Sequence, residues 1–90
     1  MNAARCPLVL VVDDRRDIFE FCERFLGEQY AFRHVGDGPG ALALLREAPA
    51  DAVLLDRDFS QADPARLLGP PADVRNEGLH VLARLREAHG

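Results

Sequence analysis

The stretch Leu8-Val9-Leu10-Val11-Val12-Asp13-Asp14 decides the fold of this 90-residue chain. Its continuous apolar run is rich in β-branched residues and predicts a strand that is covered on both faces. A second apolar run, Ala52-Val53-Leu54-Leu55, ends in Asp56. Buried apolar strands of this kind are typical of parallel sheets, whose strands end at one shared edge. We therefore expect three carboxylates at that edge, where ligands bind in open α/β sheets.

Two helix-like segments and one short strand lie between these runs. An apolar stripe with spacings of three, one, three and one predicts a helix that Asp17 caps and Gly27 ends. The stripe consists of Ile18, Phe21, Cys22, Phe25 and Leu26, and Phe19 falls outside it, in an exposed position. The run Tyr30–Val35 is shorter and more polar, which indicates an edge strand.

A second helix is expected after this strand and a third near the end of the chain. Pro39 suits the first turn of the second helix and Pro49 stops it; its apolar residues are Ala41, Leu42, Leu44 and Leu45. The last helix is expected from about Asn76 to Ala88, presenting Leu79, Leu82, Ala83 and Leu85. This alternation predicts an α/β fold of three βα units.

Asp13, Asp14 and Asp56 are the main candidates for a functional site. Carboxylate oxygens suit a hard divalent cation such as Mg²⁺, and a bound cation would let one of the acids accept a phosphoryl group. For a single aspartate, the simpler explanation is that acids end strands because the chain returns to water there. Paired acids after one strand and a third acid after another favour a site.

Composition narrows the classes of function. A net charge of -4 and a pI near 5.2 argue against nucleic acid as a direct ligand, because phosphate backbones require a basic patch. No signal peptide and no apolar stretch of about twenty residues is found, so we expect a cytoplasmic protein without a membrane partner. All 11 basic residues are arginines, which excludes a catalytic lysine. The cysteines and histidines lack metal-ligand spacing, and we assign no role to Cys6, Cys22, His34, His80 and His89.

Several motifs together resemble the receiver domain of two-component response regulators. They are Leu8–Asp14, Asp37-Gly38 with Ala41-Leu42 just after, Asp51–Asp56, and Gly78-Leu79 opening a helix that reads Leu82-Ala83-Arg84-Leu85-Arg86. The resemblance covers nearly the whole chain. It implies a flavodoxin-like parallel sheet, with strand order 2-1-3 for the units present here, and a single partial receiver domain over residues 1–90.

The resemblance also implies roles for the acids. Asp56 would be the phosphoacceptor in a phosphorelay, taking a phosphoryl group from a histidine kinase or a phosphotransfer protein. Its carboxylate would also be one of the metal ligands. Asp13 and Asp14 would hold Mg²⁺, one directly and one through water, and the backbone carbonyl of Asp58 would complete the protein ligands. A cation would relieve the repulsion among these carboxylates and neutralise charge on the phosphoryl group. The aspartyl phosphate would then act as a covalent switch in signalling, and no enzymatic turnover is expected.

The chain departs from the family in its length. A receiver has five strands in the order 2-1-3-4-5, and this chain stops after the third unit, so the family's phosphoryl-contacting hydroxyl residue and lysine are missing. Ser60, the only serine, lies in the wrong segment to replace that hydroxyl. The strand Ala52–Leu55 would become an exposed apolar edge, which favours self-association or an effector partner there. We therefore expect a fragment of a longer receiver or a shortened one.

Residues 57–77 form a second departure, a segment of about twenty residues where receivers have a tight loop. Ala65–Leu68 could form one helical turn, with its leucines packing on the body or on a partner. The segment could act as a lid over Asp56, although a mobile insertion is the simpler interpretation. Arg57 and Arg75 could meet a phosphoryl group, or could simply be solvated.

Two other functions compete for the same residues. The motif Asp56-Arg57-Asp58-Phe59-Ser60 after an apolar strand is also similar to the nucleophile motif of haloacid-dehalogenase-type phosphatases. In that family the first acid attacks a phosphate ester and the second acts as acid or base, but the later lysine that the family needs cannot exist in this chain. The second alternative is a receiver-like interaction module that is not phosphorylated and binds a partner through its surface.

Overall fold

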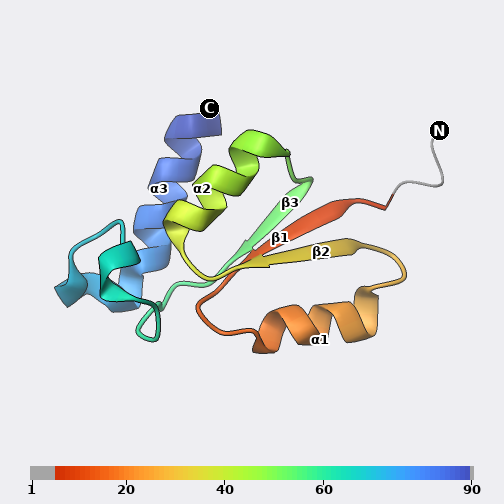
Figure 1. Ribbon diagram of the computed structural model, residues 1–90, viewed down its shortest axis with the longest axis horizontal. Coiled ribbons are helices and arrows are strands. Elements are labelled where there is room, and N and C mark those ends of the chain that lie inside the picture. The colour runs from red at the N-terminus through yellow and green to blue at the C-terminus, as the bar shows by residue number, and fades with distance from the viewer. Residues whose placement is uncertain (1–5, 90) are drawn as a thin grey trace.

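The computed structural model describes residues 6–89, with side chains described up to residue 88. Three parallel strands form one sheet: β1 (Leu8–Val12), β2 (Ala31–Val35) and β3 (Ala52–Leu55). β1 lies in the centre and pairs with both neighbours, so the strand order is β2-β1-β3 (Figure 1). The predicted α/β fold and the 2-1-3 order are confirmed, and the arrangement is consistent with a partial flavodoxin-like fold.

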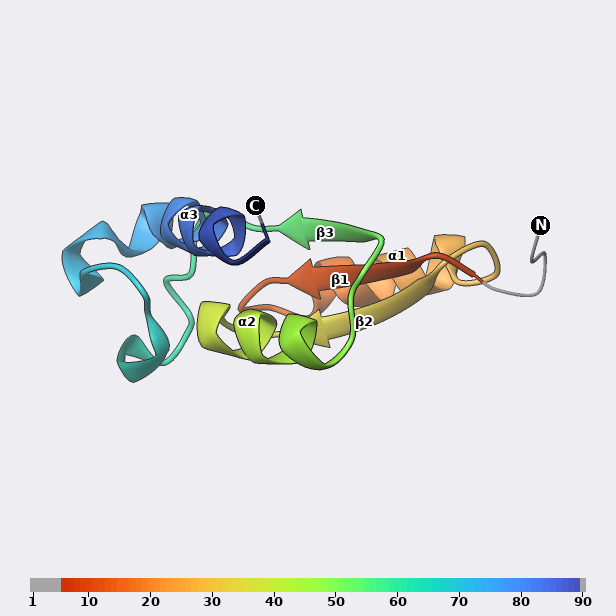
Figure 2. The same cartoon turned by 90° about the horizontal axis from the view of Figure 1, so that it is seen from above.

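Helices cover the two faces of the sheet unequally. α1 (Asp17–Leu26) lies on one face, and α2 (Gly38–Glu47) and α3 (Glu77–His89) lie on the other, as the two views show (Figures 1 and 2). None of the helices within residues 6–89 is long and apolar enough to cross a membrane.

The core lies between the sheet and the pair α2 and α3. Leu10 and Val12 of β1, Ala41 of α2 and Phe59 after β3 are almost completely buried there and contact one another. Successive residues of a strand point to opposite faces, so the residues between them point toward α1. Asp13 follows Val12 and therefore leaves the sheet on the α1 side.

The exposed and buried sides of α1 differ from the expected ones. Phe19, predicted to be exposed, is buried, and its ring stacks on His34 of β2 at 5.5 Å between centroids. Of the predicted stripe only Cys22 is buried; the exposed members are Ile18, Phe21, Phe25 and Leu26. The prediction was wrong because α1 contacts the β2 side of the sheet, and nothing among the described residues covers the flank of α1 that faces β3.

The start of α1 also differs from the expectation. Asp17 is the first helical residue and not the cap; Arg16 occupies the cap position without a side-chain hydrogen bond to the helix. The Asp17 carboxylate instead pairs with the side chain of Arg15. An acid in the first turn still interacts favourably with the helix dipole, so Asp17 suits this position for a different reason.

The helix α2 begins and ends close to the positions that Pro39 and Pro49 predict. Asp37 caps the helix by accepting a hydrogen bond from the Gly40 amide at 2.7 Å, and Pro39 lies in the first turn. The helix ends at Glu47, two residues before Pro49.

In α3 the predicted apolar face is only partly correct. Val81 and Leu85 are buried, whereas Leu79 and Leu82 are 56% and 42% exposed. The helix packs on α2 through one flank only, so the apolar residues of its other flank have no covering element among the described residues.

Residues 57–77 form defined turns and contacts. Two 3-10 turns occur, at Pro64–Arg66 and Pro71–Asn76, the first one residue before the predicted turn and capped by the Asp63 side chain. The segment returns to the body through Glu77, whose buried carboxylate accepts hydrogen bonds from the amides of Leu68 and Gly69 at 2.6 and 2.9 Å. A carboxylate with such bonds fixes the base of the segment against α3.

Candidate metal centre

Asp13, Asp14 and Asp56 meet at the carboxyl ends of β1 and β3. Each offers a carboxylate oxygen, and these three oxygens lie within 4.8 Å of one another. Asp13 is buried, and Asp14 and Asp56 are half-buried. The sequence-predicted acids are therefore brought together, because β1 and β3 are neighbours and end at the same edge.

Backbone and side-chain hydrogen bonds hold Asp13 in place. Its amide donates to the carbonyl of Val35 at 3.1 Å, and its Oδ1 accepts from the Arg15 amide at 3.0 Å. The Nε2–H of His34 donates to the carbonyl of Asp13 at 2.8 Å. His34 was assigned no role from the sequence, and the signal that could have identified it is its register position opposite Val11, two residues from Asp13.

Asp56 is positioned by its main chain. Its amide donates to the carbonyl of Val12 at 2.9 Å, and α3 begins directly against its carbonyl. Gly78 makes this approach possible, since a Cβ at this position would overlap the carbonyl oxygen of Asp56. The Gly78 amide also donates to the carbonyl of Arg57 at 2.8 Å, which ties the start of α3 to the residues around Asp56.

A hollow of about 170 Å³ opens beside the acids, lined by Asp14, Arg15, Asp56, Asp58, Ser60 and Gln61. The Gln61 amide donates to Asp14 Oδ2 at 2.7 Å, so the start of the 57–77 segment forms one wall. Ser60 donates its amide, at 2.8 Å, and its hydroxyl to Asp58 Oδ1. The sequence analysis gave Ser60 no role, because it lies in the wrong segment to replace the family's hydroxyl residue; the turn after Phe59 nevertheless places it at the wall of the hollow.

Within residues 6–89, no ion pair neutralises the negative charge of the cluster. Arg15 lines the hollow, yet its guanidinium pairs with Asp17 at 2.5 Å. Burial is the main cause that raises the pKa of Asp13. The hydrogen bond from the Arg15 amide lowers this pKa in part, and the neighbouring carboxyl groups of Asp56 and Asp14 raise it again. A divalent cation would relieve this repulsion.

The carboxyl group of Asp58 has the opposite electrostatic character. Hydrogen bonds from the Ser60 hydroxyl and amide hold the pKa of Asp58 below its usual value, and the positive charges of Arg75 and Arg57 lower it further. Both arginines are therefore near enough to interact with the charge of Asp58, although neither lines the hollow. Asp58 stays ionised at neutral pH, which suits a hydrogen-bond acceptor better than a general acid.

His80 lies apart from the three aspartates. It is a residue of α3, and its Nε2 donates to Asp73 Oδ2, in the segment that precedes α3, at 2.8 Å. The side chain of His89 lies outside the described part of the chain. Among the residues described, the three aspartates form the cluster whose atoms are close enough to share a metal ion.

Comparisons with protein-family models, with curated proteins and with solved structures return no match for this chain. The functional argument therefore rests on the residues and the geometry of the site. Three oxygen donors of like charge, one of them buried, beside an open hollow are suited to a small hard cation such as Mg²⁺ and to an anionic group that the cation attracts.

Proposed function

We propose that this chain is a phosphoacceptor of the receiver type, a signalling switch in a phosphorelay. Asp56 would accept the phosphoryl group, and Asp13 and Asp14 would hold Mg²⁺ together with an oxygen of Asp56 and the backbone carbonyl of Asp58. The observation that carries the proposal is the meeting of three carboxylates within 4.8 Å at the ends of two adjacent parallel strands.

The proposed reaction is a direct transfer between two proteins. An Asp56 carboxylate oxygen attacks the phosphorus of a phosphohistidine on a histidine kinase or a phosphotransfer protein. The P–N bond breaks, its electron pair returns to the donor imidazole, and that ring takes up a proton from water. Mg²⁺ supplies charge neutralisation for the phosphoryl oxygens.

The surroundings of Asp56 support this assignment over one to the other two acids. Asp56 lines the hollow beside the cluster, whereas Asp13 is buried and does not line it. Asp14 lines the hollow too, but its Oδ2 accepts the Gln61 amide. Asp56 is therefore the acid best placed to meet a phosphoryl group arriving from the hollow.

Intact-mass spectrometry of the full chain after incubation with Mg²⁺ and a small acyl-phosphate donor tests the proposal. We expect a gain of one phosphoryl group that is lost on chelation of Mg²⁺ and in Asp56→Asn. Asp58→Asn serves as the matched control, because it changes an acid of the same hollow and keeps the backbone carbonyl; it should retain the adduct. Absence of the adduct in the unaltered chain, or its persistence in Asp56→Asn, would contradict the proposal.

A phosphatase of the haloacid-dehalogenase type remains the second candidate, because Asp58 lines the same hollow as Asp56. In such a reaction Asp58 would have to donate a proton to the leaving group. Its lowered pKa disfavours that role. Steady release of p-nitrophenol from p-nitrophenyl phosphate, lost in both Asp56→Asn and Asp58→Asn, would establish the phosphatase and displace the switch.

A further inference from the structure

The outer edge of β3 is open along its length. In the part of the chain that the structure describes, β3 pairs with β1 alone. Residues of β3 are apolar on both faces, and Val53 and Leu54 are 38% and 46% exposed. The backbone groups on this outer side have no strand to pair with, and an apolar edge of this kind is a site for strand addition.

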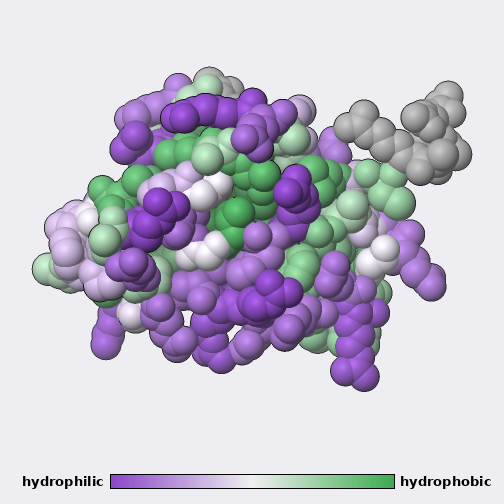
Figure 3. All heavy atoms as spheres, viewed as in Figure 1, coloured by the Kyte–Doolittle hydropathy of each residue, from purple (hydrophilic) through white to green (hydrophobic). Residues whose placement is uncertain are grey.

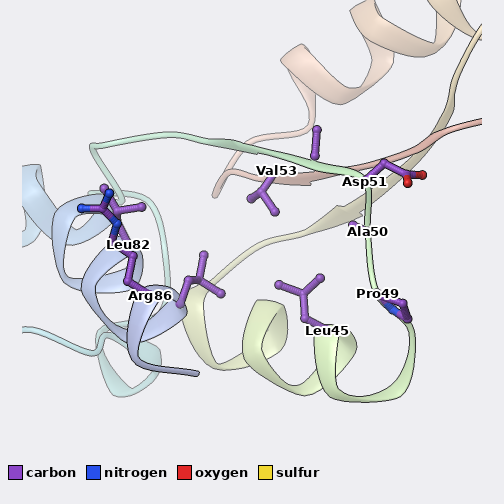
Figure 4. Close-up of a pocket in the computed structure, with 9 residues that line it drawn as sticks. Leu45, Pro49, Ala50, Asp51, Val53, Leu82 and Arg86 are labelled. Carbon is purple, nitrogen blue, oxygen red and sulfur yellow. The ribbon is translucent and has the colours of Figure 1, made fainter. Parts of the chain in front are cut away.

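One face of this edge opens into a groove between β3, α2 and α3, which we name the β3–α3 groove. It measures about 460 Å³ and is lined by Leu45, Pro49, Ala50, Asp51, Ala52, Val53, Leu82, Leu85 and Arg86 (Figure 4). Most of these residues are apolar. On the molecular surface, apolar side chains gather in the upper half of the view, around α2 and the start of β3, and polar ones dominate its lower edge (Figure 3).

The opposite face of the same edge is apolar as well. Leu54 points to the α1 side of the sheet, where it lines a second hollow of about 180 Å³ with Val11, Ile18 and Leu55; the acids Asp13 and Asp56 lie at the end of this hollow. Ile18 is 48% exposed, and the exposed Phe21 continues this flank along α1. A strand laid beside β3 would therefore meet apolar surface above and below the sheet.

We propose that the edge of β3 binds one extended segment of a partner polypeptide, which joins the sheet as a fourth strand. One side of that strand would fill the β3–α3 groove, and the other would lie beside Leu54 and Ile18. Main-chain hydrogen bonds would supply affinity, and the two apolar faces would select a run of consecutive apolar residues, the same pattern that β1 shows.

The charge of the β3–α3 groove predicts one further property of the partner segment. Arg86 lies on its rim, and no ion pair involves Arg86 within the described residues. Asp51, the acid of the groove, accepts the Leu8 amide at 2.7 Å, and its carboxylate points away from α3 (Figure 4). The groove thus presents a positive charge, which matches an acidic residue next to the partner's apolar run.

A second copy of this chain fits the same edge less well. Twofold pairing of β3 with β3 of another copy would bring both α3 helices to one face of the joined sheet, next to the shared edge, because α3 borders the groove beside β3. Adjacent strands lie about 4.8 Å apart, whereas packed helices need about 8–10 Å. A single extended segment brings no helix with it, so it avoids this crowding.

A peptide-binding experiment on the full chain tests the proposal. The probe is a fluorescein-labelled peptide of five valine and leucine residues flanked by glutamates, and its control carries proline at the centre. Fluorescence anisotropy should show saturable binding that is at least tenfold weaker for the proline peptide and for the Leu82→Glu variant. Tyr30→Glu, at an exposed position next to β2 and outside the groove, should bind nearly as well as the unaltered chain. Equal binding by Leu82→Glu and the unaltered chain would overturn the proposal.

Two further measurements test the proposal without relying on the correct folding of a single variant. They also separate it from the phosphoacceptor proposal. Arg86→Glu should weaken binding of the glutamate-flanked peptide and strengthen binding of a lysine-flanked one, and neither affinity should depend on Mg²⁺. Bound peptide should slow amide hydrogen exchange in Ala52–Leu55. Unchanged exchange there, or a dimer in sedimentation that Leu82→Glu abolishes, would contradict a single-strand partner.

Discussion

The carboxyl end of β3 and its outer edge are built in opposite ways. At the end, the start of α3 and the 57–77 segment close around Asp56, and Gly78 and Gln61 are fixed by hydrogen bonds. Along the edge, no covering element is present among the described residues, and apolar side chains face solvent on both sides. Under the two proposals made above, the end of the strand would receive a cation and a small anionic group, whereas the edge would receive an extended polypeptide segment.

The largest expected effect comes from removing Phe59, which anchors the closed end. Its side chain is fully buried in the core with Leu10, Val12 and Ala41. We expect Phe59→Ala to lower the free energy of unfolding by about 3–5 kcal/mol in urea titrations. Leu54→Ala, at the open edge of the same strand, should cost about 1 kcal/mol, because its side chain is already half exposed. If the two variants lost similar amounts of unfolding free energy, the proposed difference between the carboxyl end of β3 and its outer edge would be contradicted.

Gly78→Ala should come next in size. The added methyl group would overlap the main chain of Asp56, and relief requires α3 or Asp56 to move. Overpacking of this kind costs about 1–3 kcal/mol, and it should also reduce phosphoryl incorporation by displacing Asp56. Gly36→Ala is the matched control, because a Cβ there meets no atom within 4 Å. Thermal unfolding of both variants measures the effect on packing, and intact mass after treatment with the phosphoryl donor measures the effect on phosphoryl incorporation.

Asp13→Asn should stabilise the metal-free protein by about 1 kcal/mol, since it removes repulsion within the cluster. The pKa of Asp13 is raised above its ordinary 3.8 in the folded state, so the folded state holds this proton more tightly than the unfolded chain. The unfavourable contribution of its charge is therefore absent at lower pH, and it grows as the pH rises from 3.8 through the raised pKa.

The stability difference between Asp13→Asn and the unaltered chain should accordingly increase over that pH range and then level off. Mg²⁺ should shrink or reverse the difference near neutral pH, because it stabilises the unaltered cluster. Asp51→Asn, at the other end of β3, is the control that should show no response to Mg²⁺. A difference independent of both pH and Mg²⁺ would argue against a charged cluster.

The smallest expected effect concerns Ser60. Loss of its hydroxyl removes one of the two hydrogen bonds to Asp58, so Ser60→Ala should raise the pKa of Asp58 toward its usual value. The same hydrogen bond holds Asp58, whose backbone carbonyl is a proposed ligand of Mg²⁺, and an asparagine at position 58 would still accept it. We therefore expect phosphoryl incorporation at Asp56 in Ser60→Ala to slow by roughly threefold to tenfold, the equivalent of about 1 kcal/mol for a lost hydrogen bond. Ser60→Thr keeps a hydroxyl and should retain most of the rate. Equal rates for the alanine variant and the unaltered chain would exclude Ser60 from the site.

Much of the fold could be predicted because the strands and helices have strong local patterns. The runs at β1 and β3 are short and continuously apolar, and Pro39 and Pro49 mark the ends of α2 where the structure has them. The meeting of Asp13, Asp14 and Asp56 followed from parallel pairing alone. Local patterns therefore suffice where a residue's neighbours are fixed by the strand order.

The errors have a common physical cause. A helical period reveals an apolar stripe but not which flank of the helix meets the sheet, so Phe19 and Val81 were missed as buried residues, and Phe21 and Leu79 were expected to be buried. Ser60 was missed because its place depends on how an irregular segment turns back after Phe59. Such placement depends on contacts between residues distant in sequence, which no local pattern records.

Identification of the labelled residue tests the central claim most directly. The chain, treated with Mg²⁺ and an acyl-phosphate donor, would be reduced with borohydride, which converts an aspartyl phosphate to homoserine, and then digested and analysed by tandem mass spectrometry. We predict modification at Asp56 alone, dependent on Mg²⁺. Labelling at Asp14, at Asp58 or at no residue would contradict the account of Asp56 as the phosphoacceptor.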